Sequence, residues 1–94
     1  MDKLKVGIVG CGTIFHHHYA FIEAHPGAAV CAVADRDEKA LRKVSDRYGI
    51  KNCYNDLEEM IRKEATDVVH ITTPPQTHAA LAEAAMNLGN HVFV

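Results

Sequence analysis

The stretch that decides the fold is LKVGIVGCG, residues Leu4–Gly12. Its first six residues form a short, largely apolar run with β-branched side chains, which is typical of a buried strand. The run ends at Gly10-Cys11-Gly12, and a helix-length segment extends from Thr13 to about Glu23 before His25-Pro26-Gly27. Because proline and glycine end helices, this part of the chain predicts a strand, a glycine turn and a helix in succession.

The same alternation continues along the rest of the chain. Further apolar strands are predicted at Ala29–Ala34, Asn52–Tyr54, Asp67–Ile71 and His91–Val94. Helices are predicted from an Asp37 N-cap to Tyr48, from an Asn55–Glu58 capping pair onward, and from Gln76 to Leu88, with Gly49 and Gly89 as stops. Continuous apolar strands joined through helices call for a parallel sheet that is covered on both faces. We therefore predict a doubly wound α/β domain over residues 1–94, with strand order 3-2-1-4-5 and strand five at or near one edge.

Composition narrows the class of protein. The chain has 94 residues, of which 48% are hydrophobic and 23% charged, with a net charge of −2. These values exclude a disordered or fibrous chain, and the absence of a basic run argues against nucleic acid or an anionic membrane as a partner. Three widely spaced cysteines indicate neither a disulfide framework nor a metal knuckle. We expect a soluble, cytoplasmic globular domain.

The pair Gly10 and Gly12 lies between the first strand and the first helix, where a glycine loop can bind a dinucleotide diphosphate. Glycine at position 10 permits a tight turn, and glycine at position 12 lets the backbone approach a diphosphate at the helix N-terminus. Phe15 stands where a small residue normally lets the helix pack closely, so its ring must swing aside or hold the helix off. A purely structural turn is the alternative interpretation.

Asp35 ends the second strand, at about the 20-residue spacing that is expected of a ribose-binding acid. A carboxylate there can accept hydrogen bonds from ribose hydroxyls and would repel a 2′-phosphate. Arg36, directly after it, could stack on adenine or pair with a 2′-phosphate. We therefore expect NAD, with NADP as the alternative. A loop acid that pairs with Arg36 or caps a helix is the other interpretation of Asp35.

The run His16–His18 does not predict a metal site. Neighbours on a helix point about 100° apart, so three consecutive side chains cannot converge on one ion. His18 and His25 would lie about 10 Å apart on a helix, too far to share one zinc. Cys11 lies near a helix N-terminus that could lower its pKa, although a small packing residue is the preferred interpretation.

Three segments together give the chain a family resemblance: Gly10–Ile14 followed by His18, then Ala34–Asp37, and then TTPPQTH at Thr72–His78. With them the chain resembles, from its first strand to its fifth, the N-terminal nucleotide-binding domain of the glucose–fructose oxidoreductase / inositol dehydrogenase (Gfo/Idh/MocA) family. The TPPQTH stretch is the more specific mark, because many Rossmann proteins carry the glycine motif.

The resemblance implies an NAD(P)-binding Rossmann domain of an oxidoreductase that acts on a sugar, a cyclitol or a related alcohol by hydride transfer. It assigns Gly10, Gly12, Thr13 and Ile14 to the diphosphate, Asp35 and Arg36 to the adenosine ribose, and Thr73, Pro74, Pro75 and His78 to the nicotinamide side. The stretch Thr73–Pro75 is also explained by a strand-to-helix turn with proline at the first helical position, and both explanations can hold together.

In the family, a Glu-Lys-Pro motif follows strand five, and a second domain binds the substrate and supplies the acid/base partners. This sequence ends at Val94, so we expect the substrate domain to be absent, no catalytic residue in the chain and no turnover by the chain alone. A free-standing NAD(H)-binding or regulatory module is the alternative, and TPPQTH speaks against a methyltransferase. We also expect self-association through the strand-five edge or the surface that the second domain would cover.

Overall fold

The computed structural model describes residues 3–94, so residues 1–2 of the predicted domain lie outside the described part. The strands are β1 (Leu4–Val9), β2 (Ala28–Ala34), β3 (Cys53–Tyr54), β4 (Val68–Ile71) and β5 (His91–Phe93). The helices are α1 (Phe15–Glu23), α2 (Glu38–Tyr48), α3 (Leu57–Glu64) and α4 (His78–Asn87), with a 3₁₀ turn, η1 (Pro75–Thr77), before α4. The predicted alternation of strands and helices is confirmed, with ends that differ by a few residues.

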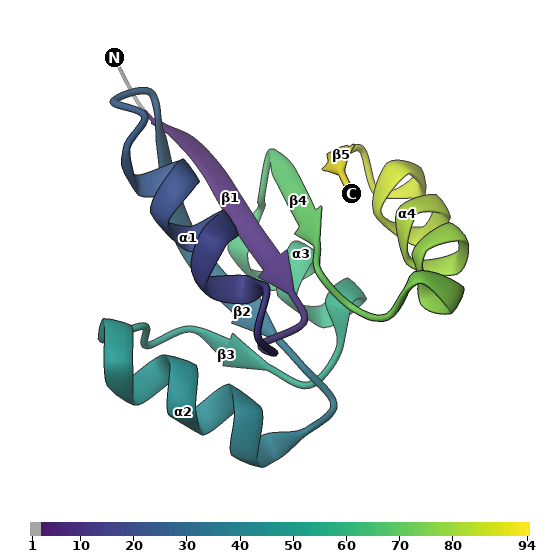
Figure 1. Ribbon diagram of the computed structural model, residues 1–94. Coiled ribbons are helices and arrows are strands. Elements are labelled where there is room, and N and C mark those ends of the chain that lie inside the picture. The colour runs from purple at the N-terminus through teal and green to yellow at the C-terminus, as the bar shows by residue number, and fades with distance from the viewer. Residues whose placement is uncertain (1–2) are drawn as a thin grey trace.

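The strands form one parallel sheet in the order β3-β2-β1-β4-β5. This order confirms the prediction, including the position of β5 at an edge (Figure 1). The register between β1 and β2 shifts once, between Val6 and Gly7, where Cys31 of β2 has no partner in β1. Because all strands run the same way, their carboxyl ends meet at one edge of the sheet, where the turns into the helices gather.

Two hydrophobic clusters cover the two faces of the sheet. Helices α1 and α2 pack on one face, where Phe15, Ile22, Leu41 and Val44 meet inward side chains of β1 and β2. Helices α3 and α4 pack on the other face, in a cluster that contains Leu57, Met60, Ile61 and Ala85. Both faces are therefore buried along the central strands, as the continuous apolar runs predicted.

Phe15 lies in the core between the sheet and helices α1 and α2. Its side chain is fully buried, and its ring lies 6.0 Å from that of Tyr19 and 5.8 Å from that of Tyr48. The two tyrosine rings stack on each other at 4.1 Å. The phenylalanine therefore joins the two helices through an aromatic cluster.

The ends of α2 agree with the predicted signals. The Asp37 side chain accepts hydrogen bonds from the amides of Lys39 and Ala40 at 3.0 and 3.4 Å. Gly49 ends the helix at a φ of +67°, in the left-handed region that favours glycine.

The predicted Asn55 cap of α3 is wrong. The N-cap is Asp56, whose Oδ2 accepts a hydrogen bond from the amide of Glu59 at 3.1 Å. The Asn55 side chain instead donates to the backbone oxygen of Asp35 and to the carboxylate of Glu38. The cap lies one residue later because α3 begins at Leu57, which is buried against the sheet.

Two other helices begin later than predicted. Helix α1 begins at Phe15 rather than Thr13, because Gly12 and the next two residues form the turn out of β1. Helix α4 begins at His78 rather than Gln76, because Pro75 opens a separate 3₁₀ turn.

A histidine pair joins α1 to β4 on the face of the sheet that α1 covers, with His70 buried and His18 half buried. His70 of β4 is 6% exposed, and its Nδ1 lies 2.9 Å from Nδ1 of His18, so one ring donates a hydrogen bond and the other accepts it. The His70 ring also stacks on Phe93 of β5 at 4.8 Å. Burial, and then the charge on His18, lowers the pKa of His70 to about 4. Burial and His17 lower the pKa of His18 as well.

We predict that this pair makes the fold acid-sensitive. The pKa of His70 falls from 6.5 to about 4 on folding, so the unfolded chain binds more protons between these values. The free energy of unfolding then falls as the pH drops through about 6.5, by up to about 3 kcal/mol, and this loss levels off below about pH 4. Urea unfolding at a series of pH values measures it.

His70→Leu should flatten this pH dependence, because the leucine carries no proton. His25→Gln is the matched control, because His25 is exposed just after α1 and its ring bonds to the Phe21 carbonyl of that helix, away from His70. An unchanged slope in the His70→Leu protein would contradict the prediction.

Candidate functional site

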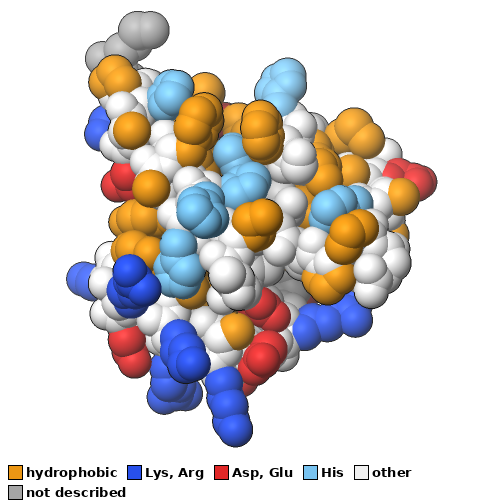
Figure 2. All heavy atoms as spheres, viewed as in Figure 1, with side chains coloured by type: hydrophobic (Ala, Val, Ile, Leu, Met, Phe, Trp, Pro, Cys, Tyr) orange, Lys and Arg blue, Asp and Glu red, His pale blue; other side chains and the backbone are white. Residues whose placement is uncertain are grey.

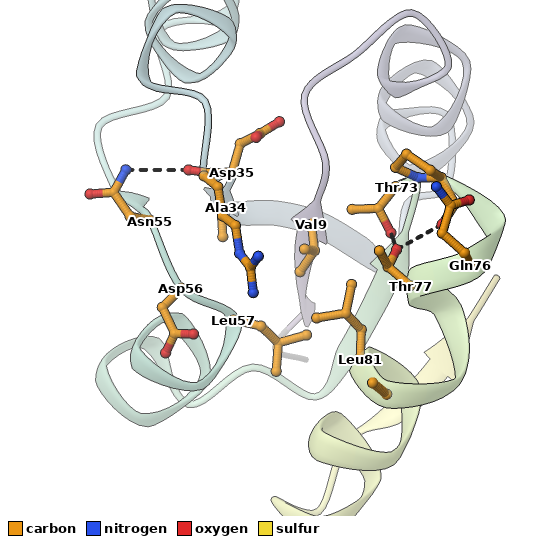
Figure 3. Close-up of a pocket in the computed structure, with 13 residues that line it drawn as sticks. Val9, Ala34, Asp35, Asn55, Asp56, Leu57, Thr73, Gln76, Thr77 and Leu81 are labelled. Atoms are coloured by element: carbon orange, nitrogen blue, oxygen red, sulfur yellow. Dashed lines mark hydrogen bonds between the residues drawn. The ribbon is translucent and has the colours of Figure 1, made fainter.

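A pocket of about 420 Å³ lies at the carboxyl ends of the strands. Its volume is typical of a small-molecule site, for which about 300–1,000 Å³ is usual. The lining comes from the ends of β1 and β2 and from the connections that precede α3 and α4 (Figure 3). The lining residues are Val9, Ala34, Asp35, Arg36, Asn55, Asp56, Leu57, Thr73, Pro74, Gln76, Thr77, Ala80 and Leu81.

Gly10 begins the turn from β1 into α1. Its φ is +102°, and a Cβ on it would lie 2.8 Å from the carbonyl carbon of Thr72 and 2.9 Å from the amide nitrogen of Thr73. Its own amide donates to the Ala34 carbonyl at 2.8 Å. The turn thus passes directly between the ends of β2 and β4, and only glycine fits there.

Gly12 is different, because a Cβ on it would have no atom of the chain within 4 Å. Packing therefore does not require glycine at this position. Among residues 3–94, the amides of Gly12, Thr13 and Ile14 donate no hydrogen bond, while the amide of Phe15 closes the turn onto the Gly12 carbonyl at 3.1 Å. Free amides at a helix N-terminus beside open space fit an anionic group such as a diphosphate.

Asp35 accepts two backbone hydrogen bonds at the end of β2. Its Oδ2 accepts from the amide of Cys11 at 2.7 Å, and its Oδ1 accepts from the amide of Asp37 at 2.8 Å. Within the described residues it forms no ion pair with Arg36. Each carboxylate oxygen has a second lone pair, so the group can still accept hydrogen bonds from a ligand in the pocket.

Cys11, between the two glycines, is not activated. Its side chain is 6% exposed, and burial followed by the charge on Asp35 raises the pKa of its thiol to about 12. The suggestion that the helix N-terminus lowers the pKa of Cys11 is therefore wrong, because the effect of burial on the pKa outweighs that of the helix N-terminus. The thiol stays protonated near neutral pH and fills space under the turn.

The connection between β4 and α4 is organised by side-chain hydrogen bonds. The hydroxyls of Thr73 and Thr77 lie 2.5 Å apart, and the Thr77 hydroxyl also lies 2.7 Å from the Pro74 carbonyl. The His78 ring donates from Nε2 to the Thr73 carbonyl at 2.7 Å. Pro75 occupies the first position of η1, as the turn interpretation predicted.

The structure brings part of the predicted site together. Asp35, Arg36, Thr73 and Pro74 line the pocket, whereas Pro75 of η1 and His78, the first residue of α4, lie outside its lining. The four residues of the glycine turn, Gly10, Gly12, Thr13 and Ile14, also lie outside the lining.

Sequence reasoning missed the part of the lining that comes from the β3–α3 connection and the start of α4. The missed residues are Asn55, Asp56, Leu57, Gln76, Thr77, Ala80 and Leu81. The topology could have shown Asn55 and Asp56, because they follow the third parallel strand at the same edge of the sheet.

The consecutive histidines point to separate partners: His16 bonds to the Tyr48 hydroxyl and His18 to His70. Across residues 3–94 there is no group of three or more His, Cys, Asp or Glu side chains that could hold a metal ion. None of the helices described is long and apolar enough to cross a membrane.

A parallel sheet with a glycine turn before its first helix, and with an acid at the end of the second strand, defines a dinucleotide-binding α/β domain. Comparison with known families gives the particular group. The model of the Gfo/Idh/MocA family, described as an oxidoreductase family with an NAD-binding Rossmann fold, matches residues 4–94. The chain belongs to this family and is an NAD-binding Rossmann domain.

Individual relatives agree with this assignment. The chain is 35% identical over 85 residues to D-apiose dehydrogenase of Rhizobium rhizogenes, covering 90% of the chain and 25% of that protein. It is 28% identical over 90 residues to myo-inositol 2-dehydrogenase of Thermotoga maritima, covering 96% of the chain and 27% of that protein. The chain also superposes on the structure of an oxidoreductase from Agrobacterium radiobacter in complex with NAD+, L-tartaric acid and magnesium. The TM-score is 0.90 at 32% identity, and the match covers 97% of this chain and 27% of that chain. The chain thus spans about a quarter of the length of these relatives.

We predict that alanine destabilises the fold at one glycine of the turn and is tolerated at the other. Gly10→Ala should lower the free energy of unfolding by at least about 2 kcal/mol, because the Cβ meets backbone atoms of Thr72 and Thr73 at a positive φ. Gly12→Ala, the matched control, should change it by no more than about 0.5 kcal/mol, because its Cβ points into open space. Thermal and urea unfolding of both variants measures this. Equal losses of stability would contradict the prediction.

Proposed function

We propose that these residues form the cofactor-binding part of an oxidoreductase that transfers hydride between NAD(H) and a sugar, a cyclitol or a related alcohol. The observation that carries the proposal is the glycine turn, with its three free amides, beside the Asp35 carboxylate in an NAD-binding family. The relatives named above support the substrate class, since they include dehydrogenases of D-apiose and myo-inositol. Bound NAD(H) would supply the hydride acceptor or donor.

The chain's own residues would hold the cofactor at three places. The amides of Gly12, Thr13 and Ile14 would donate to the diphosphate, with Gly10 shaping the turn. Asp35 would accept from the adenosine ribose, beside Arg36. The connection that carries Thr73, Pro74, Pro75 and His78 would flank the nicotinamide.

The charges around the pocket support NAD over NADP. Asp35 and Asp56 both line it, and Arg36 is the cation in the lining. A 2′-phosphate at the ribose would lie beside the Asp35 carboxylate, so repulsion would oppose its binding. Arg36 is the group that would accommodate NADP if the carboxylate were removed.

We assign residues 1–94 to the dinucleotide-binding domain alone. Because the relatives are about four times as long, the substrate-binding part and the acid/base groups would come from sequence outside these residues. The 94-residue chain by itself would then bind cofactor without turnover. We further propose a cytoplasmic location, which the three free cysteines support.

We predict that the chain binds NADH weakly and that Asp35→Ala weakens NADH more than NADPH. Loss of a charged acceptor should reduce NADH affinity by about 10- to 100-fold. The loss for NADPH should be smaller, because the repulsion of the 2′-phosphate disappears with the carboxylate. Titration calorimetry up to millimolar cofactor measures both affinities.

Asp37→Ala is the matched control, since Asp37 caps α2 outside the pocket lining. It should cost about 1 kcal/mol of stability and leave the NADH-to-NADPH ratio unchanged. A folded wild-type chain that shows no heat with NADH would refute the cofactor role of these residues.

We also propose that two copies of the chain associate through an apolar face beside β5. Ile14, His18 and Phe21 are spaced so that they share one side of α1. His18 contacts the Phe93 ring at 6.0 Å, and Ile14, Phe21 and Phe93 are each more than half exposed. Figure 2 shows histidine and apolar side chains gathered on the side of the molecule that carries α1. We call these four residues the α1–β5 face.

The open edge of β5 is continuous with this face, because Phe93 belongs to both. Unpaired strand edges favour pairing with another strand, and burial of exposed apolar groups adds about 25 cal/mol per Å² before the entropy of association is subtracted. Both contributions favour a second copy of the chain at this place.

We predict that the chain self-associates and that Phe93→Lys weakens the association. A lysine at this position would bring a charge into the α1–β5 face. Leu4→Lys is the matched control, because Leu4 is equally exposed, at 53% against 52%, but lies at the amino end of β1. Light scattering over a concentration series measures the mass. A strictly monomeric wild-type chain at high micromolar concentration, or an interface mapped to α2, would refute this proposal.

A further inference from the structure

The peptide group between Gly10 and Cys11 is hydrogen-bonded at both ends by side chains from the two neighbouring strands. The Thr72 hydroxyl, directly after β4, donates to the Gly10 carbonyl at 2.6 Å. The Cys11 amide donates to Asp35 Oδ2, directly after β2, at 2.7 Å. One bond holds the carbonyl and the other holds the amide of the same planar unit, so the unit cannot rotate without breaking both.

This peptide group precedes the free amides of Gly12, Thr13 and Ile14 by one residue. Its orientation therefore sets the direction in which the chain leaves toward those amides. Gly10 also lies so close to Thr72 that a Cβ at position 10 would come within 2.9 Å of the Thr72 hydroxyl. The Thr72 hydroxyl is also 3.1 Å from the Val9 carbonyl, but its shorter contact is with Gly10.

The proton of the Thr72 hydroxyl is directed at the backbone carbonyls of Gly10 and Val9, so the hydroxyl serves the turn. We propose that Thr72 is a positioning residue for diphosphate binding. Its hydroxyl holds the carbonyl end of the Gly10–Cys11 peptide while Asp35 holds the amide end, so that the amides after this peptide face the ligand. This inference rests on the proposed binding of NAD(H) at the glycine turn. It assigns Asp35 a second role, as the acceptor that holds the other end of the same peptide.

Three variants of the 94-residue chain separate positioning from general stability. Thr72→Val removes the hydroxyl but keeps the branched shape, and Thr72→Ser keeps the hydroxyl. Thr66→Val is the matched control: Thr66 precedes β4 at its opposite end, and its buried hydroxyl bonds to Asn90 Oδ1 at 2.7 Å, away from the turn. Thr66→Val should lower the melting temperature at least as much as Thr72→Val, because it leaves a buried amide oxygen without its donor.

Binding is measured by calorimetry with NADH, ADP-ribose and adenosine, at a temperature where every variant is folded. We expect Thr72→Val to weaken NADH and ADP-ribose by about two- to tenfold, which corresponds to one neutral hydrogen bond. Adenosine, which has no diphosphate, should bind the variant as it binds the wild type. Thr72→Ser should restore the affinities to within about twofold, and Thr66→Val should leave all three affinities unchanged.

Three results would overturn the inference: unchanged affinities in Thr72→Val, an equal loss for adenosine, or an equal loss of NADH affinity in Thr66→Val. A wild-type chain that binds no NADH would refute the proposed function instead. In that case, amide NMR spectra still decide the role of Thr72. The Cys11 and Gly12 amide signals should shift in Thr72→Val and return to their wild-type positions in Thr72→Ser. Signals that do not shift in Thr72→Val would also overturn the positioning role of Thr72.

Discussion

The close passage of Gly10 past the end of β4 is the constraint on which the candidate site depends. The residue leaves β1 with a φ of +102°, and no Cβ fits between it and the backbone of Thr72 and Thr73. This approach brings the ends of β1, β2 and β4 into hydrogen-bonding distance of one another. The first turn of α1 is thereby set beside the pocket. The amides that precede it donate no hydrogen bond to any group among the described residues. A side chain at position 10 would separate these parts.

The polar groups around this turn serve both the fold and the site. Asp35 satisfies two backbone amides and still has lone pairs directed elsewhere, so its carboxylate needs no nearby cation to remain in a half-buried place. The same carboxylate adds to burial in keeping the Cys11 thiol protonated. Asn55 extends the network from the Asp35 carbonyl to Glu38, which links the β3–α3 connection to the start of α2. The edge of the sheet is therefore held by hydrogen bonds, whereas its two faces are held by apolar packing.

The two faces of the sheet are covered unequally toward β5. On the side of α3 and α4, Val92 packs against the core. On the side of α1, Phe93 is half exposed and is met by the rings of His70 and His18. Two neutral imidazoles thus occupy a position where apolar side chains would otherwise pack, and their low pKa values follow from that placement. The predicted acid sensitivity and the proposed self-association therefore concern the same part of the molecule.

The sequence by itself determined the order of the strands and helices, the parallel sheet and the place of the glycine turn and of Asp35. Local patterns suffice for these, because apolar runs, glycines and proline act over a few residues. The sequence predicts the cap of α3 one residue too early, since Asn55 and Asp56 have similar capping ability and only the burial of Leu57 chooses between them. Tertiary structure alone decided that Phe15 joins α2, that His18 meets His70, and that Thr72 and Asp35 hold one peptide from opposite sides. Those contacts join residues far apart in the chain, and their distances depend on how the packed helices and strands bring them together.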